Sequence, residues 1–442
     1  MRARFPLRSR VGLAAVALVP LLGLLICVAA TRTNVLLPQG GRPIPNFLTG
    51  PFRYIGFHLP AGAVIAVILL MVAAYVLAVL HVGRVSTRAV VLAVVAFNLI
   101  VLIAPPLFST DVFSYQAYAR LFAIHHMNPY THGPAAMPPW DAILRYAGQK
   151  WINTPSVYGP LFTIASGALA GASVAFSMFG FKLAAALSSF GILTLTWRSA
   201  RIRGVSQRRA IALFGLNPLV TLYGVGGAHN DLLMLLFLAA ALYALLRGRY
   251  GVGGAAIIVA AAMKLTGGVL FPFALVAGHG QGGVRRLRLR LIAGAALTLL
   301  AAMIPSFLVF GAGLLKLPGT LESVQSKGQW QSIPGFLVNL TGNGKPQLVA
   351  LALGLIFACG CLWLIWRVWT GRMDWIEGAA WATVGMLLTA GLTLPWYVSW
   401  LFPLVGLTTS RRLLIASLWI TGILTVIAVV MYLPGWPPSI HI

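Results

Sequence analysis

The chain has 442 residues, of which 59% are apolar and only 9% are charged, and its long apolar runs exclude an ordinary soluble domain. The formal net charge of +26 is typical of nucleic-acid-binding proteins, but the basic residues lie in short clusters between apolar runs, where they indicate membrane topology instead. The three cysteines lie inside apolar runs and have no disulfide or metal-ligand spacing. The sequence therefore predicts an all-α polytopic membrane protein, one integral membrane domain over residues 1–442, with membrane lipid and no nucleic acid as partners.

The first apolar run, residues 11–30, follows the basic segment 1–10 and resembles a signal peptide, but it is long for one, and we expect it to remain as the first span. Twelve further runs bring the expected number of transmembrane helices to about 13. Residues 11–107 hold the first three of these spans, and residues 180–432 hold the others. The predicted spans are 11–30, 60–80, 89–107, 180–197, 210–225, 231–246, 251–263, 265–278, 291–311, 347–369, 375–394, 396–409 and 413–432.

The basic residues determine the expected orientation. With the N-terminus in the cytoplasm, 21 of the 32 lysines and arginines fall on the cytoplasmic side. Residues 156–178 are apolar enough to span, but a span there would place the five-arginine cluster at 198–209 outside. We therefore expect 156–178 to re-enter or lie in the outer interface, and 108–178 to be an outer catalytic loop with juxtamembrane helices. This predicts a multi-pass protein of the cell inner (plasma) membrane whose active site faces the periplasm or exterior.

Asp111 is the first candidate for catalysis. The chain has only six acidic residues, and Asp111 lies just beyond the proline pair that ends the third predicted span. A carboxylate kept at the end of a membrane helix indicates a functional site. From the residues alone, an aspartate that merely caps the following helix is an equally good interpretation.

Other polar residues are also predicted at the outer ends of spans, and each has a simpler structural interpretation. Lys182 and Lys264 could bind a lipid phosphate, or their side chains could snorkel to the membrane interface. Residues 229–231 could bind substrate or cap the helix that follows. Trp396 and Tyr397 could line a binding site or belong to an aromatic belt at the membrane interface. Adjacent histidines such as His125 and His126 point apart on a helix, which disfavours a metal site. The candidate substrate- or donor-binding residues are Tyr115, Arg120, His126, Tyr158, Lys182, His229, Asn230, Asp231, Lys264, Trp396 and Tyr397.

One carboxylate near cations at a membrane surface is suited to transfer from a lipid phosphate. A base removes the proton of an incoming hydroxyl group, and cations stabilise the phosphate leaving group as it gains charge. The outer carboxylates, Asp111, Asp141, Asp231 and Glu322, are scattered along the sequence, so we expect no metal or other cofactor, with a divalent cation as the alternative. The sequence also has no glycine-rich phosphate loop between a strand and a helix.

Several short motifs carry a family resemblance through their order and outer placement. They are STDVFSY at 109–115 with a later NPY, then YGPL at 158–161, GAHND at 227–231, MKLT at 263–266 and LPWYVSWLFP at 394–403. With these motifs, the chain resembles GT-C glycosyltransferases, and most closely the polyprenol-phosphate-mannose-dependent alpha-1,6-mannosyltransferases of bacterial lipomannan assembly. The resemblance covers most of the chain, from about residue 100 to 405.

The resemblance implies a GT-C fold and an inverting transfer from a polyprenyl-phosphate sugar to a glycan or glycolipid acceptor in the cell envelope. The sugar would be mannose, or another hexose or a pentose. Asp111 would be the general base, His229 and Asp231 would position the donor or acceptor, and Lys264 would contact the phosphate. The alternative is a transporter or flippase for a polyprenyl-linked sugar, which would need polar groups near mid-membrane and internal symmetry.

Overall fold

The computed structural model describes residues 7–33, 45–278, 283–326, 330–340 and 346–430, and within them every regular element is a helix. Six helical segments are long and apolar enough to cross a membrane, in agreement with the predicted all-α membrane fold. The predicted number of thirteen spans is not confirmed and stays a prediction. The six segments are Ser9–Ala29, Ala61–Arg84, Val174–Arg203, Val284–Ser326, Pro346–Trp369 and Arg411–Val430.

Seventeen α-helices follow one another in the described chain, with shorter 3-10 and π-helical segments between them. The segments that matter below are η8 (Gly167–Leu169), the π-helical η9 (Leu219–Val225) and η12 (Pro395–Trp400). The α-helices are α1 Leu7–Ala29, α2 Ala61–His81, α3 Thr87–Ile103, α4 Asp111–Ala123, α5 Pro160–Ser166, α6 Val174–Arg203, α7 Gln207–Gly215, α8 Asp231–Leu246, α9 Tyr250–Met263, α10 Leu270–Val276, α11 Val284–Phe310, α12 Leu317–Ser326, α13 Ile333–Leu340, α14 Pro346–Trp369, α15 Trp375–Thr389, α16 Phe402–Val405 and α17 Arg411–Val430.

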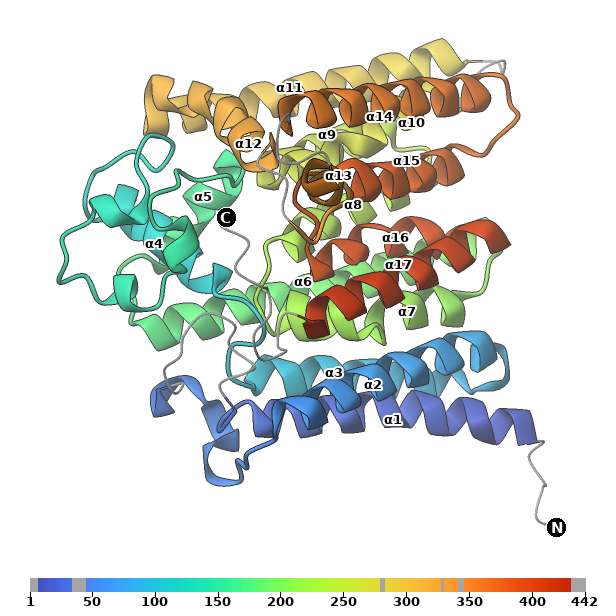
Figure 1. Cartoon of the computed structure of the whole chain (residues 1–442). Coiled ribbons are helices and arrows are strands. Elements are labelled where there is room, and N and C mark those ends of the chain that lie inside the picture. Colours follow the sequence, from blue (N-terminus) through green and yellow to red (C-terminus); the bar gives the residue numbers. More distant parts are fainter. Residues whose placement is uncertain (1–6, 34–44, 279–282, 327–329, 341–345, 431–442) are drawn as a thin grey trace.

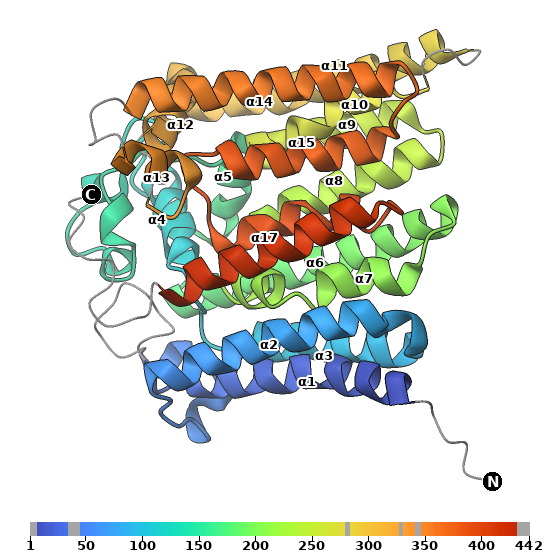
Figure 2. The same ribbon diagram turned by 45° about the vertical axis from the view of Figure 1, so that its right-hand side comes forward.

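The long helices run side by side in one bundle (Figures 1 and 2). Helices α2 and α3 both pack on α1 at one side of the bundle. From there, α3 contacts α6, α6 contacts α8, α8 contacts α9, and α9 contacts α11 at the opposite side. A continuous cluster of buried apolar residues extends through this series, so the core lies between the helices of the bundle.

Helix α6 begins earlier than the predicted span at residue 180. The Ser173 hydroxyl caps the helix by accepting a hydrogen bond from the Phe176 N–H, and α6 then runs to Gly204, whose φ of +67° ends it. The expected re-entrant segment 156–178 therefore divides into α5, η8 and the first turn of α6. The predicted boundary at 178–180 is wrong because the helix is capped at Ser173.

Two of the predicted spans are not continuous helices. In the predicted span 210–225, α7 ends at Gly215 and η9 begins after Pro218. In the predicted span 396–409, η12 is followed by the short α16, which contains Pro403. Proline lacks the N–H that a continuous helix needs at these points. Residues 396–405 are all buried, and irregular backbone at membrane depth is tolerated where protein surrounds it.

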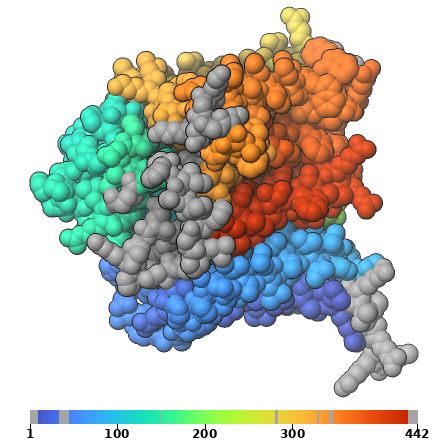
Figure 3. Space-filling model, in the orientation of Figure 1, coloured from blue at the N-terminus to red at the C-terminus, as the bar shows by residue number. Residues whose placement is uncertain are grey.

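The two ends of the bundle differ. Helices α4 and α5 lie at one end, whereas the start of α1 and the α2–α3 and α14–α15 turns lie at the other (Figures 1 and 2). Residues 108–178, the predicted outer loop, form a projection at their end of the bundle in the space-filling view (Figure 3, teal). Which end faces the cytoplasm stays a prediction. Arg2 and Arg4 of the predicted cytoplasmic segment, residues 34–44 and the end of the last predicted span lie outside the described residues.

Candidate active site

Asp111 is the first residue of α4. The Leu107 N–H donates a hydrogen bond to the Gly226 carbonyl group (3.1 Å), which holds the segment between α3 and α4 against the bundle. The Asp111 N–H donates to the Ser109 hydroxyl group (3.1 Å). Thr110, not Asp111, occupies the N-cap position of α4, which disfavours the simple capping interpretation. The Asp111 side chain is 24% exposed, so its carboxylate is accessible.

A tight turn at residues 226–230 brings the H-N-D motif toward Asp111. The His229 N–H donates to the Gly224 carbonyl group (2.8 Å), and Ala228 adopts a φ of +55°. A Cβ atom on Gly226 would lie 2.0 Å from the Leu222 carbonyl oxygen, so the turn requires glycine there. The turn leaves the His229 side chain fully buried.

Three side chains meet where this turn approaches α4. The Asp111 Oδ2 atom lies 3.4 Å from His229 Nδ1, and the hydroxyl oxygen of Tyr115, one helical turn beyond Asp111, lies 3.5 Å from the same nitrogen. The Asn230 N–H donates to the Tyr115 hydroxyl oxygen (3.2 Å). The first two distances are longer than a well-formed hydrogen bond, so the Asp111 carboxylate is close to His229 without being tightly bound to it.

Asp231, the first residue of α8, is in contrast fully engaged. Lys264 Nζ donates to both of its carboxylate oxygens, at 2.8 and 2.9 Å, and the Trp400 indole N–H donates to one of them at 2.6 Å. The Lys264 ammonium group also lies over the Tyr397 ring, 4.5 Å from its centroid. These contacts fix the lysine, which sits at the end of α9, beside the H-N-D turn.

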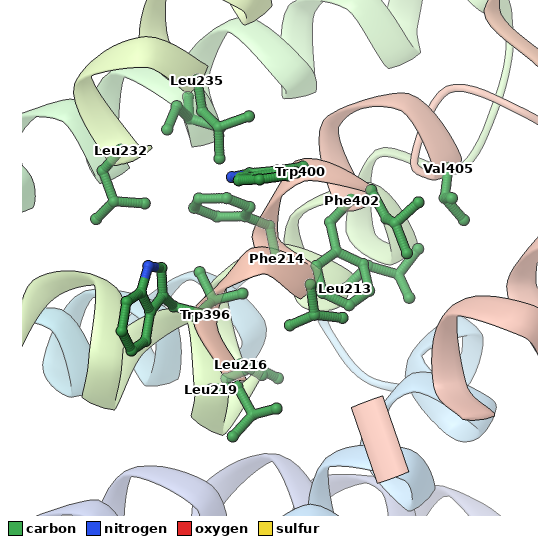
Figure 4. Close-up of a cluster of buried hydrophobic side chains, with 14 of the residues drawn as sticks. Leu213, Phe214, Leu216, Leu219, Leu232, Leu235, Trp396, Trp400, Phe402 and Val405 are labelled. Carbon is green, nitrogen blue, oxygen red and sulfur yellow. The ribbon is translucent and has the colours of Figure 1, made fainter. Parts of the chain in front are cut away.

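The aromatic residues of η12 cover this turn. The Trp396 ring stacks on the His229 ring with centroids 3.7 Å apart, and the Tyr397 ring stacks on Trp400 at 4.2 Å. Figure 4 shows Trp396 and Trp400 from η12 beside Leu232 of α8. Because Trp396 and Tyr397 are buried, the structure disfavours the alternative that they form an interfacial belt.

The Y-G-P-L motif completes the arrangement from the outer loop. The Gly159 N–H donates to the Met263 carbonyl group (3.1 Å), and a Cβ atom on Gly159 would lie 2.1 Å from the Ala262 carbonyl oxygen. This close approach places Tyr158 edge-on to the Tyr115 ring, with centroids 4.9 Å apart. The structure thus joins five separate motifs in one group, which we call the Asp111 cluster. Its members are Asp111, Tyr115, Tyr158, His229, Asn230, Asp231, Lys264, Trp396, Tyr397 and Trp400.

Arg120 belongs to a different network. It lies about 13 Å along α4 from Asp111 at the helical rise of 1.5 Å per residue. Arg120 Nε donates to both carboxylate oxygens of Asp141 (3.0 and 2.9 Å), and His125 Nε2 lies 2.8 Å from Asp141 Oδ2. Burial would raise the pKa of the Asp141 carboxyl group, but hydrogen bonds from His125, the Ile143 N–H and Arg120 lower it below its usual value. This Arg120–Asp141–His125 network ties together the outer loop.

The structure does not bring His126 and Lys182 to the Asp111 cluster either. His126 is exposed and adopts a φ of +53° just after α4. Lys182 is fully buried on α6, where its ammonium group donates to the carbonyl groups of Ala104 and Pro105 at the end of α3. Lys182 therefore anchors the segment that leads to Asp111, and the alternative that it snorkels to the interface does not fit its burial.

Trp400 is the member of the cluster that the sequence interpretation did not include among the site residues. Its signal was its place in the same LPWYVSWLFP motif as Trp396 and Tyr397. From the sequence, Asp141 was noted only as one of the few acidic residues of the chain. Among the described residues, no three His, Cys, Asp or Glu side chains gather at one point, and the expected independence from metal stays a prediction.

Comparison with known proteins gives two matches to family models. Residues 9–280 match the family described as alpha-(1->6)-mannopyranosyltransferase, N-terminal domain, and residues 331–435 match the MptB C-terminal domain. Among individual relatives, alpha-(1->6)-mannopyranosyltransferase A of Mycobacterium tuberculosis is 28% identical over 354 residues, which cover 74% of this chain and 66% of that protein. Alpha-(1->6)-mannopyranosyltransferase A of Corynebacterium glutamicum is 26% identical over 347 residues, which cover 69% of this chain and 67% of that protein.

These alignments span about two thirds of the length of each relative. The two family-model matches together include every motif of the Asp111 cluster, since the first contains residues 111–264 and the second contains residues 396–400. The first match alone covers more than half of the chain. The chain therefore belongs to the alpha-(1->6)-mannopyranosyltransferase family, in agreement with the resemblance predicted from its motifs.

Proposed function

We propose that this chain transfers a mannosyl residue from polyprenyl-phosphate mannose to a glycan or glycolipid acceptor, with inversion at the anomeric carbon and an alpha-(1->6) linkage. The family and the names of the relatives support mannosyl transfer. The observation that carries the mechanism is the accessible Asp111 carboxylate at one end of the membrane bundle, beside a buried histidine and a buried Asp231–Lys264 ion pair.

Asp111 is the carboxylate best placed to act as the base. Asp231 is almost fully buried and accepts hydrogen bonds from Lys264 and Trp400, and Asp141 is paired with Arg120. Those hydrogen bonds occupy the carboxylate oxygens of both residues, so an incoming hydroxyl group has less access to them. Within the part of the chain that the structure describes, the Asp111 carboxylate has only the long contact to His229, and its side chain remains 24% exposed. An incoming hydroxyl group can therefore reach its oxygens.

The proposed step balances without an added reactant. The 6-hydroxyl oxygen of the acceptor forms a bond to the anomeric carbon, and its proton passes to Asp111. The bond between that carbon and the phosphate oxygen breaks, and polyprenyl phosphate leaves with the electron pair. A beta-linked donor then gives an alpha-linked product. The His229 ring, 3.4 Å from Asp111, lies beside the carboxylate during the transfer.

Lys264 is the proposed partner of the phosphate. Negative charge grows on the phosphate as the bond breaks, and a nearby fixed cation stabilises it. Lys264 has three N–H donors, of which Asp231 occupies two, and its side chain is 17% exposed. The donor's prenyl chain would remain in the bilayer. We also propose the plasma membrane as the location, with the N-terminus in the cytoplasm and the Asp111 cluster on the outer face.

The test is an assay of purified protein in detergent with short-chain polyprenyl-phosphate mannose and an alpha-1,6-linked mannose oligosaccharide. Asp111→Asn should reduce transfer by about 1,000-fold, since general-base catalysis contributes about 10²–10⁴-fold. Transfer by the wild-type protein should not change when a chelator is added. A glucosyl donor in a parallel reaction tests the identity of the sugar.

Asp374→Asn is the matched control. Asp374 is 32% exposed and lies in the turn between α14 and α15, at the opposite end of the bundle from α4. It caps α15, and asparagine caps helices equally well, so this variant should keep wild-type activity. Full activity of Asp111→Asn would remove Asp111 as the base. Binding of the donor with no transfer by the wild-type protein would favour the flippase alternative.

A further inference from the structure

Five buried side-chain atoms, four in the Asp111 cluster and one on the neighbouring Ser399, have no hydrogen-bond partner among the described residues. Twelve such atoms occur in the described chain, so nearly half of them lie in two short segments, the H-N-D turn and η12. Leaving a buried polar group unpaired costs about 1–3 kcal/mol, and such a concentration indicates a site that a polar ligand completes. The five atoms are His229 Nε2, Asn230 Oδ1, Asn230 Nδ2, Trp396 Nε1 and Ser399 Oγ.

The two segments that carry these atoms are in direct contact. The His229 and Trp396 rings stack at 3.7 Å, and the side chains of Asn230 and Ser399 are each about 1% exposed. In Figure 4 the indole nitrogens of Trp396 and Trp400 are both turned toward the end of α8 near Leu232. The Trp400 N–H donates to Asp231, the residue after Asn230, and Trp396 stacks on His229, the residue before it, so η12 contacts the H-N-D turn on both sides of Asn230.

The hydrogen-bonding chemistry of the five unpaired atoms indicates which part of the proposed donor they would contact. A phosphate group only accepts hydrogen bonds and would be matched by donors alone, and a prenyl chain makes none. The Trp396 N–H only donates, whereas the Asn230 amide and the Ser399 hydroxyl group both donate and accept. A sugar hydroxyl group also both donates and accepts, so this mixed set is complementary to the hydroxyl groups of a sugar.

We propose that His229, Asn230, Trp396 and Ser399 form a subsite for the sugar that is transferred, and that Asn230 is its specificity-determining residue. This inference rests on the proposed function. The Asn230 amide presents an NH₂ donor group and a carbonyl acceptor side by side, and the hydrogen bond from its backbone N–H to Tyr115 holds the residue in the turn. Such an amide matches one arrangement of two neighbouring hydroxyl groups, whereas the Ser399 hydroxyl can rotate to suit several.

The experiment combines variants of Asn230 with donors that each lack one hydroxyl group. Wild-type protein and Asn230→Ala would be assayed with polyprenyl-phosphate mannose and with its 2-, 3- and 4-deoxy counterparts. For at least one deoxy donor, wild-type kcat/KM should fall about 100-fold, as expected when a buried group is left unpaired. For the intact donor, the kcat/KM of Asn230→Ala should be lower than that of the wild-type protein by a similar factor. The kcat/KM values of Asn230→Ala for that deoxy donor and for the intact donor should agree within about threefold.

Asn98→Ala is the matched control, because Asn98 is also a fully buried asparagine but lies within α3, bonded to the Val94 carbonyl group of its own helix. It should keep wild-type discrimination. If Asn230→Ala is not monodisperse after purification, Asn230→Asp, which has the same shape but lacks the NH₂ donor, should show the same loss of discrimination.

The outcomes separate the two proposals. Wild-type discrimination retained by a folded Asn230 variant overturns the assignment of Asn230 while the proposed function stands. Equal use of the intact and all deoxy donors by the wild-type protein overturns the sugar subsite. Absence of transfer by the wild-type protein from any mannosyl donor overturns the proposed function, and this inference with it.

Discussion

Helix α4 contributes to two polar networks, one at each end, and they differ in how completely their polar groups are paired. At its far end, Asp141 is buried between Arg120 and His125, and both of its oxygens accept hydrogen bonds. At its start, the Asp111 carboxylate is accessible and only loosely contacted, and neighbouring segments hold unpaired buried atoms. A network in which every polar group has a hydrogen-bond partner stabilises the fold. A network with unpaired polar groups can still form hydrogen bonds to a ligand.

The largest effect on stability in this comparison should come from Asp231, the one paired carboxylate within the Asp111 cluster. Asp231→Asn leaves Lys264 without a counter-charge in a mostly buried position, so the free energy of unfolding should fall by about 3 kcal/mol. The double variant Asp231→Asn/Lys264→Met should recover most of that loss but not the transfer activity. Thermal unfolding of the three proteins in detergent measures the first effect, and the mannosyl transfer assay measures the second.

A wild-type unfolding temperature in Asp231→Asn would contradict this prediction and would mean that Lys264 finds another partner. Recovery of activity in the double variant would show that neither charge is needed for transfer. Lys264 would then no longer be the proposed contact of the phosphate.

The Arg120–Asp141–His125 network should instead show its effect through pH. The pKa of Asp141 is lowered in the folded protein, so its contribution to stability is complete at neutral pH and is lost as the pH falls below its usual value of 3.8. Limited proteolysis should therefore find the outer loop protected at pH 7 and increasingly cleaved below about pH 4. Asp141→Asn should be cleaved faster at pH 7 and should show a weaker acid transition.

Transfer by Asp141→Asn should fall less than about tenfold, because the start of α4 keeps its own contacts and the expected loss is about 1 kcal/mol of outer-loop stability. A loss as large as that of Asp111→Asn would contradict the division of α4 into a structural and a catalytic end.

His126 should give the smallest effect. It was predicted to bind the donor, but it is exposed and lies beyond the Arg120–Asp141–His125 network. His126→Ala should change kcat/KM by less than about twofold and the unfolding free energy by less than about 0.5 kcal/mol, as is usual for exposed positions. A tenfold rise in KM for the donor would restore His126 to the site.

Much of the fold could be predicted because apolar runs of span length have few alternatives to a membrane helix. The failures occur where hydropathy carries no information about backbone continuity. Residues 396–409 are apolar, yet Pro403 divides them into η12 and α16. The predicted start of α6 was too late for a related reason. The helix begins at its capping residue, Ser173, and the length of an apolar run gives no information about a cap.

The candidate site was predictable where residue types are rare. Asp111 and Asp231 stood out because the chain has six acids, and the structure brings both into one cluster. Lys182 was chosen for its predicted place at the outer end of a span, but it is directed into the bundle, since its partners are backbone carbonyl groups that no sequence pattern identifies. Trp400 was recognised only as an aromatic, because its bond to Asp231 joins residues 169 positions apart.

The buried bond from Lys182 to the end of α3 has a consequence for the order in which the protein is made. Asp111 leaves the ribosome before Lys182, and the residues of η12 follow much later. The segment that carries the carboxylate is therefore anchored only after α6 has been inserted beside α3. A nascent chain therefore has no assembled Asp111 cluster until η12 has been synthesised and has packed against the H-N-D turn.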